Sequence, residues 1–159
     1  MTLNLRLAHL RDASEIARMA RDLIEVGLSG WSWHPARVAR AIRSSSSNVL
    51  VARAREHIVG FAIMEFGDAQ AHLNLFAVSP THQRCGIGTR MMGWLEDSAL
   101  VAGIATISLE LRANNQPARD FYRTLEFKET GYIAGYYRGV ETALRMTRDI
   151  RRQIPDRIN

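Results

Sequence analysis

Apolar and polar residues alternate along several short stretches of the chain, and this two-residue period predicts β-strands. The first such stretch is LNLRLA at residues 3–8. The stretch HLNLFAV at residues 72–78 is instead almost wholly apolar, which predicts a central strand buried on both faces. The predicted strands are residues 3–8, 49–54, 57–66, 72–78, 105–111, 129–137 and 141–147.

Between these strands, apolar residues recur at the three- and four-residue spacing of helices. Ile16, Ala20 and Leu23 share one face of the first predicted helix, with Asp12 as its N-cap and Glu15 at the capping-box spacing. The other predicted helices cover residues 36–42, the stretch after Gly88 that carries Met91, Met92, Leu95 and Ala99, and the stretch after Asn115 that carries Pro117 in its first turn. The order β-α-α-β-β-β-α-β-α-β-β predicts an α/β fold, a single domain with a mixed sheet of about seven strands flanked by about four helices.

Composition narrows the class of ligand and the compartment. The 159 residues suit one domain, expected over residues 1–150 with a basic tail at 151–159, and the net charge of +5 favours an anionic ligand or partner. A cofactor phosphate would satisfy this charge as well as RNA would, and no recognised RNA-binding motif accompanies it.

The single Cys85 excludes an internal disulfide and fits a reducing compartment. The N-terminus lacks a signal-peptide core, and the longest uncharged stretch, Ser98–Leu109, is too short to span a bilayer, so we expect a soluble cytoplasmic protein.

The clearest motif is VSPTHQRCGIG, in which a predicted strand passes into a helix through a turn with two glycines. Gly86 and Gly88 leave backbone N–H groups at a helix start, where anions bind, and the missing side chains let a phosphate approach closely. A Walker A loop is excluded because the turn has no Lys, and a Rossmann turn because Met91 stands at its third glycine position. A tight turn without a ligand is the alternative.

The turn resembles the acetyl-CoA-binding motif of the GNAT superfamily of N-acetyltransferases, Q/R-x-x-G-x-G/A, with Gln83 and Arg84 before the two glycines. A second block, NNQPARDFYRTLEF, is similar to the family's N-x-x-A-x-x-F-Y-x-x-L-G-F. The resemblance runs from residue 3 to residue 148 and implies the GNAT fold, with acetyl-CoA as co-substrate. Glu126 departs from it, because the family usually has Gly at that position.

The resemblance also implies which residues hold the cofactor. The backbone amides of the glycine turn would hold the CoA pyrophosphate, and the N–H groups of residues 76–78 would meet the acetyl and pantetheine parts. Asn115 either caps its helix only or also contacts CoA. The implied cofactor-binding residues are Phe76, Ala77, Val78, Gln83, Arg84, Cys85, Gly86, Ile87, Gly88, Thr89 and Asn115.

Glu110 is the candidate general base. In ISLELR the apolar residues share one face of a strand, while Ser108, Glu110 and Arg112 share the other. A mid-strand carboxylate is costly unless it faces water or has a partner, so position alone favours an ion pair with Arg112 or with a residue on a neighbouring strand. Within GNAT the chain is most similar to bacterial ribosomal-protein-alanine N-acetyltransferases, whose L-E-V-R-x-x-N-x-x-A string matches Glu110, Arg112 and Asn115. That resemblance implies that Glu110 accepts a proton.

Tyr122 is the candidate general acid. It shares a helix face with Ala118, and a lone tyrosine there would be read as a core residue with a satisfied hydroxyl. The resemblance of the block that runs from Asn115 to Tyr122 implies instead that its phenol protonates the sulfur of CoA. Cys85 lies in the phosphate turn with no His–Asp arrangement around it, so we expect direct transfer without a covalent enzyme intermediate. The five His residues show no metal-ligand spacing, so we expect no metal.

Aromatic residues predict the walls of the acceptor site. Trp31 and Trp33 fall in the loop region that covers this site in the family's fold, although anchoring the loop onto the core is the alternative. Tyr136 and Tyr137 lie on the last predicted hairpin, the opposite wall by resemblance. Such walls suit the N-terminus of a peptide, and they would also suit an aromatic small amine.

We therefore expect an acetyl-CoA-dependent N-acetyltransferase acting on a protein N-terminus, with a ribosomal protein as a candidate partner. A small-molecule amine acetyltransferase is the alternative enzyme, and a CoA-binding module without turnover is the alternative outside enzymes. No membrane or DNA partner is expected. We expect the arginines near the C-terminus to be solvated, and docking to ribosomal RNA is the more specific alternative. These residues are Arg148, Arg151, Arg152 and Arg157.

Overall fold

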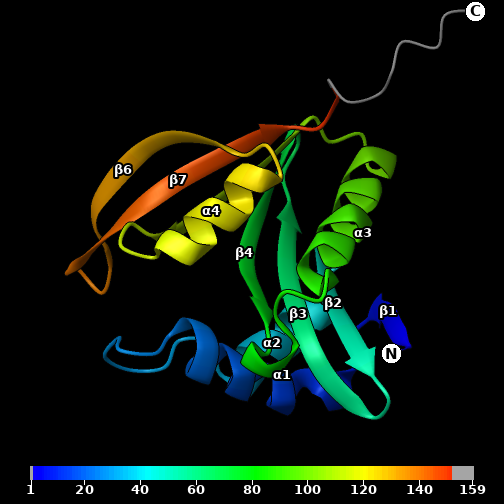
Figure 1. Ribbon diagram of the computed structural model, residues 1–159. Helices are drawn as coiled ribbons and strands as arrows, with labels where there is room; N and C mark the ends of the chain where they lie inside the picture. Colours follow the sequence, from blue (N-terminus) through cyan, green and yellow to red (C-terminus); the bar gives the residue numbers. More distant parts are fainter. Residues whose placement is uncertain (1, 152–159) are drawn as a thin grey trace, which may run out of the picture. The chain divides into compact units, whose positions relative to one another are not determined.

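The computed structural model describes residues 2–151, which form seven strands and four α-helices (Figure 1). The strands are β1 (Leu3–Leu7), β2 (Ser47–Ala54), β3 (His57–Phe66), β4 (Gln70–Val78), β5 (Thr106–Arg112), β6 (Lys128–Tyr137) and β7 (Glu141–Asp149). The α-helices are α1 (Ala13–Met19), α2 (Pro35–Arg43), α3 (Ile87–Val101) and α4 (Gln116–Thr124). Shorter helical turns are η1 (Leu10–Asp12), η2 (Ala20–Ile24), which is a π-helix, and η3 (Pro80–His82). Within the described residues, no helix has the length and apolar character needed to cross a membrane.

The strands form one mixed sheet in the order β1-β2-β3-β4-β5-β7-β6. The predicted α/β class and the predicted order of strands and helices are confirmed. The chain divides into two compact units, of which the first runs to Glu65 and includes Leu73–Leu95, and the second comprises Phe66–His72 and the chain from Glu96 onward. The expected division into residues 1–150 and a tail at 151–159 stays a prediction, and residues 152–159 lie outside the described part of the chain.

In the first unit, α1 and α2 cover one face of the strands. Ile16 of α1, Val38 of α2 and Phe61 of β3 are fully buried in one apolar cluster. Because successive strand residues point to opposite faces, Gly60 faces away from this cluster and toward α3. A Cβ at Gly60 would lie only 2.8 Å from the Sδ of Met91, so β3 and α3 pack this closely because position 60 has no side chain.

The strand β4 is well covered on one face only, so the prediction of a strand buried on both faces is wrong. The buried residues are Ala71, Leu73, Leu75 and Ala77, and the half-buried residues that alternate with them are His72, Asn74, Phe76 and Val78. The apolar run concealed this difference because Phe76 and Val78 fall on the less covered face. That face therefore presents two of the three β4 residues that the sequence assigns to the cofactor.

The first helix begins after Asp12, as predicted, but the side chain of Asp12 makes no cap hydrogen bond to α1. Its carboxylate instead accepts the N–H of His9 (2.7 Å) and a guanidinium N–H of Arg6 (2.9 Å). The turn η1 starts before Asp12, so the carboxylate bonds backward to the residue that precedes this turn. Burial raises the pKa of Asp12, but the bonds to Arg6 and His9 outweigh burial and hold the pKa below its usual value.

In the second unit, β5, β7 and β6 pair antiparallel in that order. Asn115 caps α4 as predicted, since the N–H of Ala118 donates to its Oδ1 (3.3 Å). Tyr122 is buried near the end of this helix and packs edge-on against Phe127, with 5.6 Å between ring centres. The helix thus carries Tyr122 into the core of the unit.

The turn between α4 and β6 is left-handed at Glu126, which has a φ of 67°. We expect Glu126→Gly to raise the free energy of unfolding by about 1 kcal/mol, because left-handed backbone costs a non-glycine residue about 1–2 kcal/mol. The greater entropy of glycine in the unfolded chain offsets part of this gain. Urea unfolding measures the difference.

Glu126→Ala is the matched control, because it removes the same carboxylate but keeps the Cβ that causes the backbone cost. We expect no gain from this control. An equal gain in both variants would assign the cost to the carboxylate and refute the backbone explanation.

The expectation that Arg148 is solvated is wrong. The strand β7 extends to Asp149, beyond the predicted end at residue 147, so Arg148 belongs to the sheet. It is buried, and its guanidinium pairs with Glu96. Arg151 is exposed and donates to the carbonyl of Gly103 (2.9 Å), whereas Arg152 and Arg157 lie outside the described residues.

Candidate active site

The turn between β4 and α3, in the first unit, is held by the side chain of Gln83. Its amide donates a hydrogen bond to the carbonyl of Val78 (3.1 Å), which closes the loop around η3. The backbone is left-handed at Arg84 (φ 62°) and at Gly86 (φ 77°). Glycine adopts this conformation without steric cost, whereas Arg84 does so at a cost that the rest of the loop must offset. Gly86 is therefore favoured by the backbone of the turn, because it avoids the steric cost that Arg84 bears.

The N-terminus of α3 has the geometry of an anion site. The N–H of Arg90 bonds the carbonyl of Gly86, the residue just before the helix (3.1 Å). The N–H groups of residues 86–89 therefore precede the hydrogen-bond ladder of the helix and lie at the positive end of its dipole. Ile87 is buried and anchors the helix start, while Cys85 and Thr89 are exposed at the turn.

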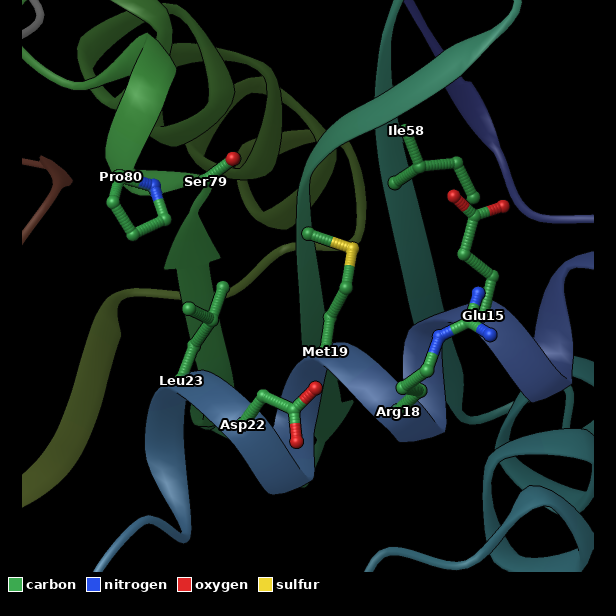
Figure 2. Close-up of a pocket in the computed structure, with 8 residues that line it drawn as sticks. All are labelled: Glu15, Arg18, Met19, Asp22, Leu23, Ile58, Ser79 and Pro80. Carbon is green, nitrogen blue, oxygen red and sulfur yellow. The ribbon is translucent and has the colours of Figure 1, made fainter.

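A groove in the first unit runs between α1 with η2 and the end of β4 (Figure 2). It is lined by Glu15, Arg18, Met19, Asp22, Leu23, Ile58, Ser79 and Pro80. Ser79 and Pro80 directly follow Val78, so the groove reaches the end of the strand segment assigned to the cofactor. Two carboxylates and one guanidinium stand among apolar side chains, an arrangement that suits an amphipathic ligand.

The loop that leads to α2 folds around the buried carboxylate of Glu25. Its Oε1 accepts the N–H (2.8 Å) and the Oγ hydroxyl (2.6 Å) of Ser32, and its Oε2 accepts the N–H of Trp33 (3.2 Å). Trp33 is 8% exposed and belongs to the apolar core, with the guanidinium of Arg37 3.8 Å from its ring centre. The ring of Trp31 is half-buried against the same core. Through these contacts the two tryptophans anchor the loop to the core. Their role in acceptor binding stays a prediction.

In the second unit, Glu110 lies between two basic partners on neighbouring strands. The register of β5 and β7 places it opposite Arg145, whose Nε donates to its Oε1 at 2.9 Å. Its Oε2 accepts a hydrogen bond from Nε2 of His72 on β4. Arg112, the other partner considered from the sequence, pairs instead with Glu141 (3.2 Å).

These partners keep Glu110 ionised. Burial raises the pKa of this carboxyl, but the hydrogen bonds and positive charges of His72 and Arg145 outweigh burial and lower the pKa below its usual value. A carboxylate with a lowered pKa is a weaker base than an unperturbed one. The role of Glu110 as proton acceptor stays a prediction.

Tyr122 is held in a form that suits a proton donor. Burial raises the pKa of its hydroxyl, and the neighbouring Tyr137 raises it further, so Tyr122 is neutral at physiological pH. Its ring is fixed between Phe121 and Phe127, with ring centres 5.3 and 5.6 Å away. The predicted role as general acid is compatible with this environment and stays a prediction.

Tyr136 and Tyr137 link the two candidate catalytic residues electrostatically. Their rings meet edge-on with centres 4.9 Å apart, and Tyr136 is the more exposed of the two. Burial raises the pKa of both hydroxyls, and the charge of Glu110 contributes to both shifts. Since Tyr137 also acts on Tyr122, the second unit brings Glu110, Tyr122 and this tyrosine pair into one region.

Sequence reasoning missed His72 and Glu25. The position of His72 within an otherwise apolar strand was a usable signal, because a polar side chain there must face either water or a partner. Glu25 carried no such signal, since it follows a helix at a position where a solvated carboxylate is ordinary. Among residues 2–151, no group of three His, Cys, Asp or Glu side chains is placed to hold a metal ion.

Comparison with solved structures identifies the architecture. The ribosomal-protein-S18-alanine N-acetyltransferase from Escherichia coli superposes with a TM-score of 0.78 at 26% identity, over 94% of each chain. The fold is therefore that of the GNAT acetyltransferases. A family model described as Acetyltransferase (GNAT) family matches residues 14–127, and the chain belongs to this family.

Two curated relatives align with part of the chain. The ribosomal protein bS18-alanine N-acetyltransferase of Escherichia coli strain K12 is 36% identical over 80 residues, which are 50% of this chain and 54% of that enzyme. The N-alpha-acetyltransferase RimI of Mycobacterium tuberculosis is 32% identical over 110 residues, which are 67% of this chain and 68% of that protein. The chain thus spans about half the length of the Escherichia coli relative in the sequence alignment.

Proposed function

We propose that this chain is an acetyl-CoA-dependent N-acetyltransferase that transfers the acetyl group directly to a primary amine. The observation that carries the proposal is the turn before α3, where the left-handed Gly86 and the N–H groups of residues 86–89 suit a pyrophosphate. Membership of the GNAT family supports acetyl-CoA as the donor. The proposed cofactor contacts are residues 76–78, residues 83–89 and Asn115.

Within this reaction we assign Tyr122 to the acid side and the Glu110 carboxylate to the base side. The incoming ammonium must lose a proton before its nitrogen can attack, and the departing thiolate must gain one. The buried, neutral hydroxyl of Tyr122 supports its assignment as the general acid. The position of Glu110 on the polar face of β5, in the same unit, supports its assignment to the base side.

For the acceptor we propose the N-terminus of a protein, with a ribosomal protein in the cytoplasm as the candidate. The similarity to an enzyme named for the alanine of ribosomal protein bS18 supports this choice. The edge-on pair Tyr136 and Tyr137 also supports it, because aromatic side chains suit a peptide wall. Cys85, the single cysteine of the chain, suits a reducing compartment.

We expect peptides that begin with alanine to be acetylated faster than spermidine or free amino acids. Release of CoA thiol, measured for each acceptor with acetyl-CoA, gives the comparison. The matched control is the same peptide with its α-amine blocked and an internal lysine retained, which should not react. Turnover confined to small amines would make the chain a small-molecule acetyltransferase, and CoA binding without any turnover would make it a binding module.

A further inference from the structure

The Glu110 carboxylate is poorly placed to take a proton from an acceptor amine itself. Its two oxygens are each engaged, Oε1 by Arg145 and Oε2 by His72. Its side chain is 5% exposed, whereas the side chain of His72 is 35% exposed. Of the two members of the pair, His72 is therefore the one that an acceptor can reach.

We propose that His72 is the immediate proton acceptor for the incoming ammonium and that Glu110 is its positioning residue. Imidazole side chains serve widely as general bases in catalysis, and this one is the more exposed member of the pair. A carboxylate bonded to one ring nitrogen fixes the tautomer and the ring orientation, and it stabilises the imidazolium that forms. This inference rests on the proposed N-acetyltransferase function and refines its base side.

Charged and titratable groups on the neighbouring strands surround the pair formed by His72 and Glu110. On β7 the guanidinium of Arg145 contacts Glu110 and keeps it anionic, so that it stays a hydrogen-bond acceptor for His72. On β6, desolvation raises the pKa of the Tyr136 and Tyr137 hydroxyls above the usual tyrosine value, so both are neutral. Arg112 and Glu141 pair with each other close to Tyr137, and β4 itself carries no Asp, Glu, Lys or Arg. Glu110 therefore remains an anionic hydrogen-bond acceptor that orients the ring of His72.

The proton balance of the step is complete without another reactant. His72 takes one proton from the ammonium and releases it to solvent after the reaction. The freed nitrogen then attacks the acetyl carbonyl carbon, the C–N bond forms and the C–S bond breaks. The thiolate takes a proton from the Tyr122 hydroxyl, and Tyr122 regains one from the nitrogen of the new amide. The products are the acetylated amine, CoA thiol and one released proton.

His72→Gln tests the proposal, because glutamine keeps an amide donor for Glu110 but has no basic nitrogen. We expect kcat/KM at pH 7 to fall by roughly 10²–10⁴, the usual contribution of general base catalysis. The acid limb of the pH–rate profile should vanish, while calorimetry should show CoA binding unchanged. Added imidazole should restore part of the rate of His72→Ala. His57→Gln, at an exposed histidine of β3, is the matched control and should keep the parent rate.

Glu110→Gln decides the question independently, including the case in which His72→Gln does not fold. If His72 is the base, this variant keeps an acid limb that moves to lower pH, because the imidazolium has lost its anionic partner. Complete loss of that limb in Glu110→Gln, or a parent rate and profile in His72→Gln, overturns the proposal and makes Glu110 the direct base. A parent protein that acetylates no amine overturns the proposed function instead, and with it this inference.

Discussion

In the Gly88→Asp variant, affinity for CoA is expected to fall by roughly five- to a thousand-fold while the fold persists. The new carboxylate lies in the first turn of α3, beside the proposed position of the pyrophosphate. Two unit charges about 4 Å apart repel by about 1 kcal/mol in water and about 4 kcal/mol near a protein surface. Since about 1.4 kcal/mol is tenfold in Kd, the loss is measurable by calorimetry with CoA.

Gly93→Asp is the matched control for this experiment. Gly93 lies further along the same helix, and a Cβ added there meets no atom within 4 Å. The control therefore adds the same side chain and charge away from the helix N-terminus, and CoA affinity should not change. An acidic residue in the first turn of a helix is favourable for stability, so Gly88→Asp should not unfold. Unchanged affinity in Gly88→Asp would contradict the assignment of the pyrophosphate to this turn.

Tyr122→Phe is expected to lower kcat and kcat/KM together by roughly 10²–10⁴, the usual contribution of a general acid. Both constants should fall because the hydroxyl acts only when the thiolate departs, in the transition state. High pH should not restore the rate, since deprotonating the amine does not replace the missing acid. CoA binding should persist because the ring remains packed against Phe127.

The measurement is the pH–rate profile of Tyr122→Phe beside that of the parent protein, with thermal unfolding as the check on the fold. A rate within a factor of about two of the parent would be far below a general acid's usual contribution. Tyr122 would then be an ordinary core residue of α4.

Much of the fold was predictable because its signals are local. The strand β3 has the predicted bounds, and Asn115 caps α4 as its position before Pro117 indicated. Local signals failed where residues outside the element decide the outcome. Asp12 bonds Arg6 from the preceding strand, and the half-exposed face of β4 depends on which elements cover it.

The candidate site divides in the same way. The glycine turn is contiguous in sequence, so its residues could be named together. The structure adds that the backbone at Gly86 is left-handed, a conformation that glycine adopts without steric cost. The Glu110 cluster joins β4, β5 and β7, and its members lie 35 and 38 residues from Glu110 along the chain. The sequence placed Glu110 on a polar strand face, but only the register of the strands reveals Arg145 and His72 as its partners.

The clamp formed by Glu25 has a consequence for how proteins of this kind diverge. Its carboxylate ties the end of η2 to Ser32 and Trp33, so the two ends of the loop are joined independently of the residues between them. Residues 26–30 are mostly exposed. Substitutions at its exposed side chains are expected to leave the core of the unit in place, while the N–H of Leu28 bonds the carbonyl of Glu25 (3.0 Å). Substitution of the other residues would therefore change the surface shown to partners on an unchanged scaffold, whereas Gly27 (φ 79°) and Gly30 (φ 78°) have the left-handed backbone that favours glycine.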